Sequence, residues 1–158
     1  MLSGRRGAAV ALVLLAMQMG AWGGQQPGAE AVVTLTAALA RPDAAGKQRL
    51  TVVVQIAPGW HVYGNPAGSD DFIPTTLTVK AASPLRSLKL NYPEGKRVKD
   101  PGAGELFVYE KSAQLTAEWQ ADGAGVEAVD LTLPYQACNA DACLPPKTLE
   151  MRVKLPGK

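Results

Sequence analysis

Residues 50–57, LTVVVQIA, carry the strongest β-strand pattern in the chain. Apolar and β-branched residues fill the segment, and Pro58-Gly59 ends it with a turn signal. Residues 32–40, VVTLTAALA, show a similar pattern, and the polar stretch 41–48, RPDAAGKQ, separates the two segments. Two strands joined by a polar turn predict an antiparallel β-hairpin.

The rest of the chain continues with short apolar segments between turn signals, without an internal repeat or a helical period. The segment at residues 60–63, WHVY, follows the Pro58-Gly59 turn signal, and we predict that the strand pattern continues at residues 75–81, 85–90, 106–109, 113–119, 128–135 and 148–155. Residues 64–74 and 91–104 are predicted to be loops, the second with three glycines and two prolines. Seven to nine short strands favour an all-β fold, an immunoglobulin-like antiparallel β-sandwich. A lipocalin-like barrel is the alternative fold.

The first 23 residues have the three parts of a secretory signal peptide. Arg5 and Arg6 form a basic region, residues 8–17 are apolar, and residues 21–23 fit a small-x-small cleavage site. The apolar part is too short to span a bilayer, and an uncleaved membrane anchor is the alternative interpretation. We therefore expect a signal peptide at 1–23, a flexible lead-in at 24–30 and a single β-sandwich domain at 31–158. Export would place the chain in an oxidising compartment, where disulfides persist.

The charge balance excludes some classes of partner. The chain has 16 basic and 14 acidic residues, and residues 1–23 contain two arginines and no acid. The remainder is therefore close to neutral, which argues against binding to nucleic acid or to an anionic membrane surface. Because no second long apolar segment follows, we expect no membrane span in the mature chain.

Both cysteines lie in residues 133–147, LPYQACNADACLPPK. A disulfide between Cys138 and Cys143 would close a ring of about six residues, worth roughly 2 kcal/mol, against nearly 5 kcal/mol for a ring of about a hundred. A disulfide between two cysteines so close in sequence stabilises a β-domain only weakly. Its redox chemistry can therefore matter more than its contribution to stability. The spacing alone supports a redox-active pair and a structural disulfide about equally.

Thiol–disulfide exchange needs one cysteine to attack and a second to resolve the mixed disulfide, and two cysteines in one loop meet that need. The spacing is not Cys-x-x-Cys and no βαβ pattern surrounds it, so a thioredoxin fold is not expected. Tyr135, Pro145 and Pro146 would stiffen the loop. Asp141, inside the ring, would raise the pKa of a neighbouring thiol.

Other polar and aromatic residues give weaker signals. His61, the only histidine, could join the two cysteines in a zinc site, but the cysteine spacing does not fit, and a half-buried residue is the better interpretation. Trp60 and Tyr63 are expected in the core or on a sheet surface. We expect Asp70-Asp71 to lie in a solvated turn. The basic run Lys96, Arg97 and Lys99 is expected to form a solvated loop. We expect no metal and no cofactor.

Two motifs resemble a known family. The pattern Tyr135-Gln136-x-Cys138…Cys143-x-Pro145-Pro146, together with PGWHVY at residues 58–63, Asn65-Pro66 and Pro74-Thr75, is similar to the amino-terminal periplasmic domain of DsbD-type thiol:disulfide interchange proteins. The similarity covers roughly residues 30–155. It implies an immunoglobulin-like domain in the periplasm whose cysteines relay electrons without a cofactor, as part of a protein-disulfide reductase.

By this resemblance, Cys143 is the cysteine that forms mixed disulfides and Cys138 is its resolving partner. Reducing equivalents would come from a thioredoxin-like protein and pass to exported thiol or disulfide proteins, such as disulfide isomerases and cytochrome c maturation factors. In the family the donor belongs to the same polypeptide. Because the sequence ends at Lys158, we expect a separate donor here.

The family shields its disulfide with a cap loop that bears an aromatic residue. Residues 96–104 should match that loop and contain no aromatic residue, so Phe107 and Tyr109, which follow this segment, are the candidate substitutes. Two rival functions stay open at this stage. One is a non-enzymatic β-sandwich module that binds a protein and carries a structural disulfide, and the other is a zinc-binding domain.

Overall fold

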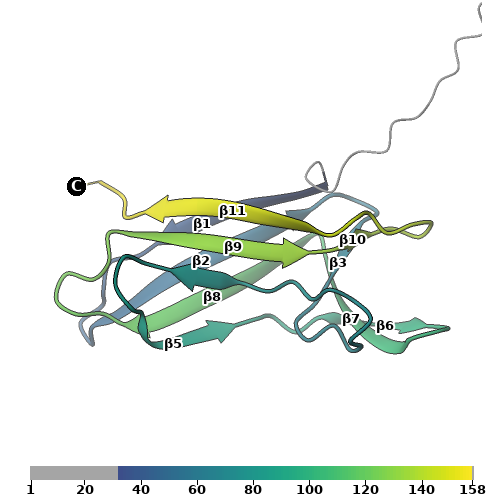
Figure 1. Cartoon of the computed structure of the whole chain (residues 1–158), viewed down its shortest axis with the longest axis horizontal. Coiled ribbons are helices and arrows are strands. Elements are labelled where there is room, and N and C mark those ends of the chain that lie inside the picture. The colour runs from purple at the N-terminus through teal and green to yellow at the C-terminus, as the bar shows by residue number, and fades with distance from the viewer. Residues whose placement is uncertain (1–31, 158) are drawn as a thin grey trace, which may run out of the picture.

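The computed structural model describes residues 32–157, which form three antiparallel β-sheets (Figure 1). The first sheet contains, in spatial order, β1 (Val33–Leu39), β2 (Lys47–Ile56), β8 (Ser112–Gln120) and β5 (Arg86–Asn91). The second contains β11 (Lys147–Lys154), β9 (Ala128–Tyr135) and β4 (Thr78–Lys80). The third contains β10 (Ala137–Cys138), β3 (His61–Tyr63), β7 (Gly104–Glu110) and β6 (Lys96–Asp100). The predicted signal peptide and lead-in, residues 1–30, lie outside the described residues.

The main core lies between the sheets and follows from side-chain alternation along the long strands. In β2, Leu50, Val52 and Val54 are fully buried while the residues between them face outward. Strands β8 and β9 repeat this pattern. Each fully buried aliphatic side chain contributes about 1.5–3 kcal/mol, so three such strands supply most of the driving force for the sandwich. The predicted all-β sandwich is confirmed.

The predicted first hairpin is also confirmed. Strands β1 and β2 pair from Val33 opposite Ile56 to Leu39 opposite Leu50. The side chain of Asp43 closes the turn, since its Oδ1 accepts hydrogen bonds from the amides of Ala45 and Lys47, both at 2.9 Å.

The prediction that residues 91–104 form one long loop is wrong. Residues Lys96–Asp100 form β6, which pairs with β7 from Lys96 opposite Val108 to Asp100 opposite Gly104. Asp100 Oδ1 accepts the amides of Gly102 and Ala103, both at 2.8 Å, and so closes a tight turn. Strand β6 is a solvated edge strand, and its side chains Lys96 and Arg97 form ion pairs with Glu110 and Glu105 of β7. Because such a strand lacks the alternation of apolar and polar residues, its sequence resembles that of a loop.

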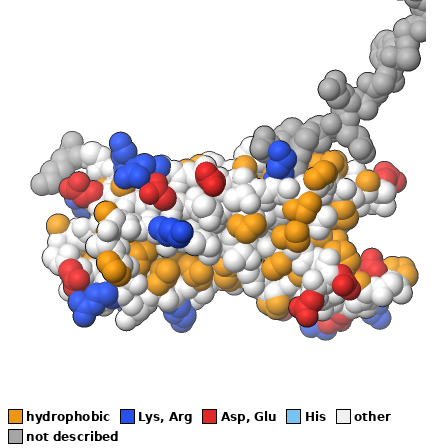
Figure 2. All heavy atoms as spheres, in the orientation of Figure 1, with side chains coloured by type: hydrophobic (Ala, Val, Ile, Leu, Met, Phe, Trp, Pro, Cys, Tyr) orange, Lys and Arg blue, Asp and Glu red, His pale blue; other side chains and the backbone are white. Residues whose placement is uncertain are grey.

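The third sheet forms one end of the elongated molecule (Figure 1). Hydrophobic side chains gather on the visible surface at this end (Figure 2). A second, smaller core cluster lies here, formed by Tyr63, Ala67, Leu106, Val108 and Cys138, with Phe72, Val98 and Ala103 packed against it. One cysteine is therefore part of a cluster distinct from the main core. No helix within residues 32–157 is long and apolar enough to cross a membrane.

Candidate functional site

Cys138 and Cys143 form a disulfide at the edge of the third sheet, with an S–S distance of 2.05 Å and a Cα–Cα distance of 4.0 Å. The two sulfur-bearing residues differ sharply in exposure. Cys138 lies on β10 and is only 2% exposed, whereas Cys143 lies beyond the turn and is exposed. An external thiol or disulfide can therefore reach Cys143 but not Cys138.

Hydrogen bonds of the backbone and of the Asn139 side chain define the cysteine turn independently of the disulfide. Asn139 Oδ1 accepts the amides of Asp141 at 2.9 Å and Ala142 at 2.8 Å. The amide of Asn139 donates to the carbonyl of Ala142 at 2.9 Å, and the amide of Leu144 donates to Ala137 at 2.8 Å. The turn that carries Cys143 is therefore held at several points.

Tyr63 lies directly against the disulfide. Its hydroxyl is 3.5 Å from Cys138 Sγ and 3.8 Å from Cys143 Sγ, and it is the only possible donor because the bonded sulfurs carry no proton. Burial, reinforced by the negative charge of Asp100, raises the pKa of Tyr63 above its usual 10. The hydroxyl therefore stays protonated at neutral pH and can donate to either sulfur.

Phe72 covers Tyr63 from the loop between β3 and β4. The two ring centroids are 4.5 Å apart with planes inclined at 36°. The loop is tied to the sheet, because the amide and the hydroxyl of Thr75 both donate to the carbonyl of Tyr63, at 3.0 and 2.7 Å. The result is an aromatic pair, Phe72 on Tyr63, stacked beside the disulfide.

The strand register brings further side chains to the same face. His61 on β3 lies opposite Cys138 on β10 and opposite Glu110 on β7. Directly opposed residues share a face and have Cβ atoms about 5 Å apart. His61 is half-buried, and its ring meets Tyr63 edge-on at 5.8 Å and 83°. A row of cysteine, histidine and glutamate thus crosses three strands.

Phe107 and Tyr109 lie on the other face of β7, because they alternate with Leu106 and Val108 of the small cluster. The Tyr109 hydroxyl donates to the carbonyl of Pro93 at 3.0 Å and accepts the amide of Asn65 at 3.2 Å, whereas Phe107 has the Arg97 guanidinium 5.8 Å from its ring centroid. Tyr109 thus anchors the start of the loop that carries Phe72.

The remaining predicted loop residues take different positions. Tyr135 is fully buried at the end of β9, in the main core. Gln136 Nε2 donates to the carbonyl of Leu144 at 3.5 Å. Asp141 lies exposed at the tip of the turn, and Pro145 and Pro146 are exposed after it.

The structure also tests the weaker expectations. His61 is half-buried and Tyr63 is buried in a core cluster, as predicted. Asp70 and Asp71 are exposed, as expected for a solvated turn. Among residues 32–157, no three His, Cys, Asp or Glu side chains come together as a metal site would require.

Sequence reasoning missed the contacts that four residues make at the site. Phe72 was only part of a predicted loop, and the contact between Tyr63 and the sulfurs depends on tertiary packing. Asn139 carried a usable signal, because an Asn followed by two small or acidic residues is typical of a turn closed by its own side chain. The position of His61 beside Cys138 could be found only from the register of β3 and β10.

Comparisons with known proteins agree with this geometry. The sequence model of the family described as "Thiol:disulfide interchange protein DsbD, N-terminal" matches residues 29–155. The reduced N-terminal domain of DsbD from Neisseria meningitidis is similar, with a TM-score of 0.53 and 23% identity over 83% of this chain and 90% of that one. The N-terminal periplasmic domain of ScsB from Proteus mirabilis has a TM-score of 0.60 and 15% identity over 78% of this chain and 47% of that one.

A comparison with the curated proteins found no match. The two structural likenesses, at these identities, support the fold. The family match is broader, because it spans nearly all of the described residues and includes both cysteines. The chain therefore belongs to the family of the N-terminal domain of the thiol:disulfide interchange protein DsbD.

Proposed function

We propose that this chain is a periplasmic thiol:disulfide exchange module that relays two electrons at a time through the pair Cys138–Cys143. The observation that carries the proposal is the unequal exposure of two disulfide-bonded cysteines, one exposed and one 2% exposed. Family membership and the periplasmic ScsB domain of similar fold support the compartment.

The exchange has two steps. In the reduced chain, the Cys143 thiolate attacks a disulfide of the partner, forms a mixed disulfide and releases one partner thiolate. The Cys138 thiolate then attacks Cys143 Sγ, the mixed disulfide breaks, and the second partner sulfur leaves as a thiolate. The partner has gained two electrons and the chain is oxidised. A thioredoxin-like dithiol restores the reduced state in two steps. One of its thiolates attacks Cys143 with Cys138 as leaving group. Its second thiolate then attacks the first donor sulfur, which releases Cys143 as a thiolate and leaves the donor oxidised.

Tyr63 and Phe72 have separate roles in this scheme. A Tyr63 hydroxyl that donates to either sulfur stabilises the thiolate formed on that sulfur, because charged acceptors make stronger hydrogen bonds. Phe72, stacked on Tyr63, acts as the cap that limits access to the disulfide. We propose this role for Phe72 in place of Phe107 and Tyr109, whose side chains project from the opposite face of the sheet.

Capture of mixed disulfides tests the proposal. The reduced chain is incubated with an oxidised thioredoxin-like protein, quenched with acid and alkylated, and run on a non-reducing gel. Cys138→Ser should accumulate more of the covalent complex than the wild type, because only reversal by the released partner thiol can then remove it, and Cys143→Ser should form none. The wild type should form the complex only transiently.

The exposed serine at residue 112 offers a matched control. A Ser112→Cys change in the Cys143→Ser background supplies an exposed thiol away from the site, and it should not restore capture at a comparable rate. Equal capture by the two single serine variants would contradict the assigned roles. Absence of capture by both would instead favour a binding module with a structural disulfide.

A further inference from the structure

The buried cysteine poses a proton-transfer problem. Cys138 must become a thiolate before it can resolve a mixed disulfide, since the thiol itself is a poor nucleophile. Its 2% exposure leaves almost no contact with water. A neighbouring group that accepts the proton, and that itself reaches solvent, would solve the problem.

His61 is the residue beside Cys138. The two are opposed in the β3–β10 pairing, so their Cβ atoms are about 5 Å apart on one face of the sheet. The ring of His61 also meets the ring of Tyr63 edge-on, and the Tyr63 hydroxyl is 3.5 Å from Cys138 Sγ. The histidine therefore lies in the immediate surroundings of the buried sulfur.

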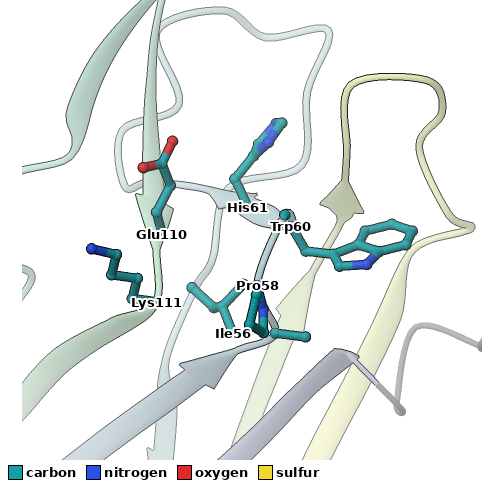
Figure 3. Close-up of a pocket in the computed structure, with 8 residues that line it drawn as sticks. Ile56, Pro58, Trp60, His61, Glu110 and Lys111 are labelled. Carbon is teal, nitrogen blue, oxygen red and sulfur yellow. The ribbon is translucent and has the colours of Figure 1, made fainter.

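His61 also lines an open pocket. It has a volume of about 570 Å³ and is lined by His61, Glu110, Lys111, Trp60 and residues 56–59. In Figure 3, His61 and Glu110 point to the same side of the strands, while Trp60 points away from them. His61 thus belongs both to the surroundings of the buried thiol and to the wall of a space open to solvent.

We propose that His61 is the general base of the resolving step and the general acid of its reversal. Neutral His61 takes the Cys138 proton, and the resulting thiolate attacks Cys143 Sγ. The Cys138–Cys143 bond forms, the bond between Cys143 and the partner breaks, and the partner leaves as a thiolate. The proton then passes from His61 to water in the pocket. This inference rests on the exchange function proposed above.

The charges around His61 suit a proton acceptor at neutral pH. Burial lowers the pKa of His61 below its usual 6.5, Glu110 on β7 raises it, and Lys96 on β6 lowers it. Lys96 and Glu110 are themselves paired at 2.8 Å, so their opposite effects partly cancel. Tyr63 stays protonated, and Lys111 is exposed on the pocket wall. His61 is therefore mainly neutral at pH 7 and free to accept a proton.

A two-phase thiol assay tests the proposal. The reduced chain is mixed with one equivalent of dithiobis(nitrobenzoate), whose released thiolate is yellow. Attack by Cys143 releases the first thiolate, and attack by Cys138 on the mixed disulfide releases the second. His61→Ala should slow the second phase at least tenfold at pH 7, since general base catalysis typically contributes about a hundredfold or more. The first phase should stay within twofold of wild type.

Two further readouts separate proton transfer from a structural role. The second phase should lose its rise between pH 5 and pH 7 in His61→Ala and in the bulkier His61→Gln. Added imidazole should restore part of the His61→Ala rate, because the pocket is open. Lys111→Ala, on the same pocket wall, is the matched control and should leave both phases unchanged.

The outcomes distinguish this inference from the function on which it rests. A wild-type chain without a second phase would overturn the exchange proposal, and the role of His61 with it. A normal wild type with an unaffected His61→Ala variant would overturn only the role of His61. So would a slow variant that keeps the wild-type pH profile and gains nothing from imidazole.

Discussion

Reduction of the disulfide should weaken the fold only modestly. The Cys138–Cys143 bond closes a ring with a sequence separation of 5. For a loop of about six residues, the loss of loop-closure entropy in the unfolded chain gives about 2 kcal/mol. Because Cys138 belongs to the small cluster at one end and not to the main core, we expect no further loss from core packing.

The structure also indicates that the turn survives reduction. The bond from the amide of Leu144 to the carbonyl of Ala137 and the two bonds that Asn139 Oδ1 accepts involve no sulfur atom, so we expect them to persist when the sulfurs separate. Chemical denaturation of the oxidised and reduced chains should therefore give equal slopes and free energies of unfolding that differ by about 2 kcal/mol. For a domain of this size the melting temperature should fall by about 6–10 °C.

The Cys138→Ser, Cys143→Ser double variant controls for the reducing agent. It should behave like the reduced chain in both measurements and should show no further change when reductant is added. A loss above about 4 kcal/mol, or a reduced chain that no longer unfolds cooperatively, would refute the reasoning. The disulfide would then be needed for the stability of the fold. That result would support the alternative function, a protein-binding module with a structural disulfide.

Three further predictions concern the site and its supports. Gly68→Ala should destabilise the chain by at least 1 kcal/mol more than Gly59→Ala, because both glycines have positive φ but only a Cβ at residue 68 would lie 2.5 Å from a carbonyl oxygen of β7. Denaturation curves of the two variants test this, and equal losses of unfolding free energy would contradict the clash. Phe72→Ala should speed reduction of the disulfide by dithiothreitol about two- to tenfold, the equivalent of one aromatic stacking contact; Ile73→Ala in the same loop should not, and equal rates would exclude the cap. Burial lowers the pKa of His61, so near pH 6.5 and below it the unfolded chain binds more protons than the folded chain. The free energy of unfolding should therefore fall as the pH drops from 7 to 5.5. The same fall in a His61→Phe variant would show that His61 is not its cause.

The sandwich could be predicted because its strands bury one face and expose the other. Alternation in β2, β8 and β9 is visible in the sequence itself, and so is the turn that joins β1 to β2. The cysteine pair could be predicted as a local disulfide because its spacing leaves few other geometries. These features depend on neighbours in the chain.

The missed features depend on neighbours in space. Strand β6 is an exposed edge strand with sequence KRVKD, and such strands lack the apolar alternation that marks β2. Phe72 lies in the polar segment SDDFIP, which has no periodic pattern. The opposition of His61 and Cys138 depends on the register of a two-residue strand, which no local signal specifies.

The ring size and the position of the disulfide together favour a role in thiol–disulfide exchange over a role in stabilising the fold. A bond that stabilises the fold by about 2 kcal/mol is itself stabilised by the fold to the same extent, which lowers its reduction potential by only about 40 mV relative to the unfolded chain. A ring of about a hundred residues would lower it by about 100 mV on the same reasoning. Ala137 and Leu144, both buried in the main core, hold the two ends of the turn whether or not the sulfurs are joined. The pair can therefore open and close while the sandwich beneath it stays intact.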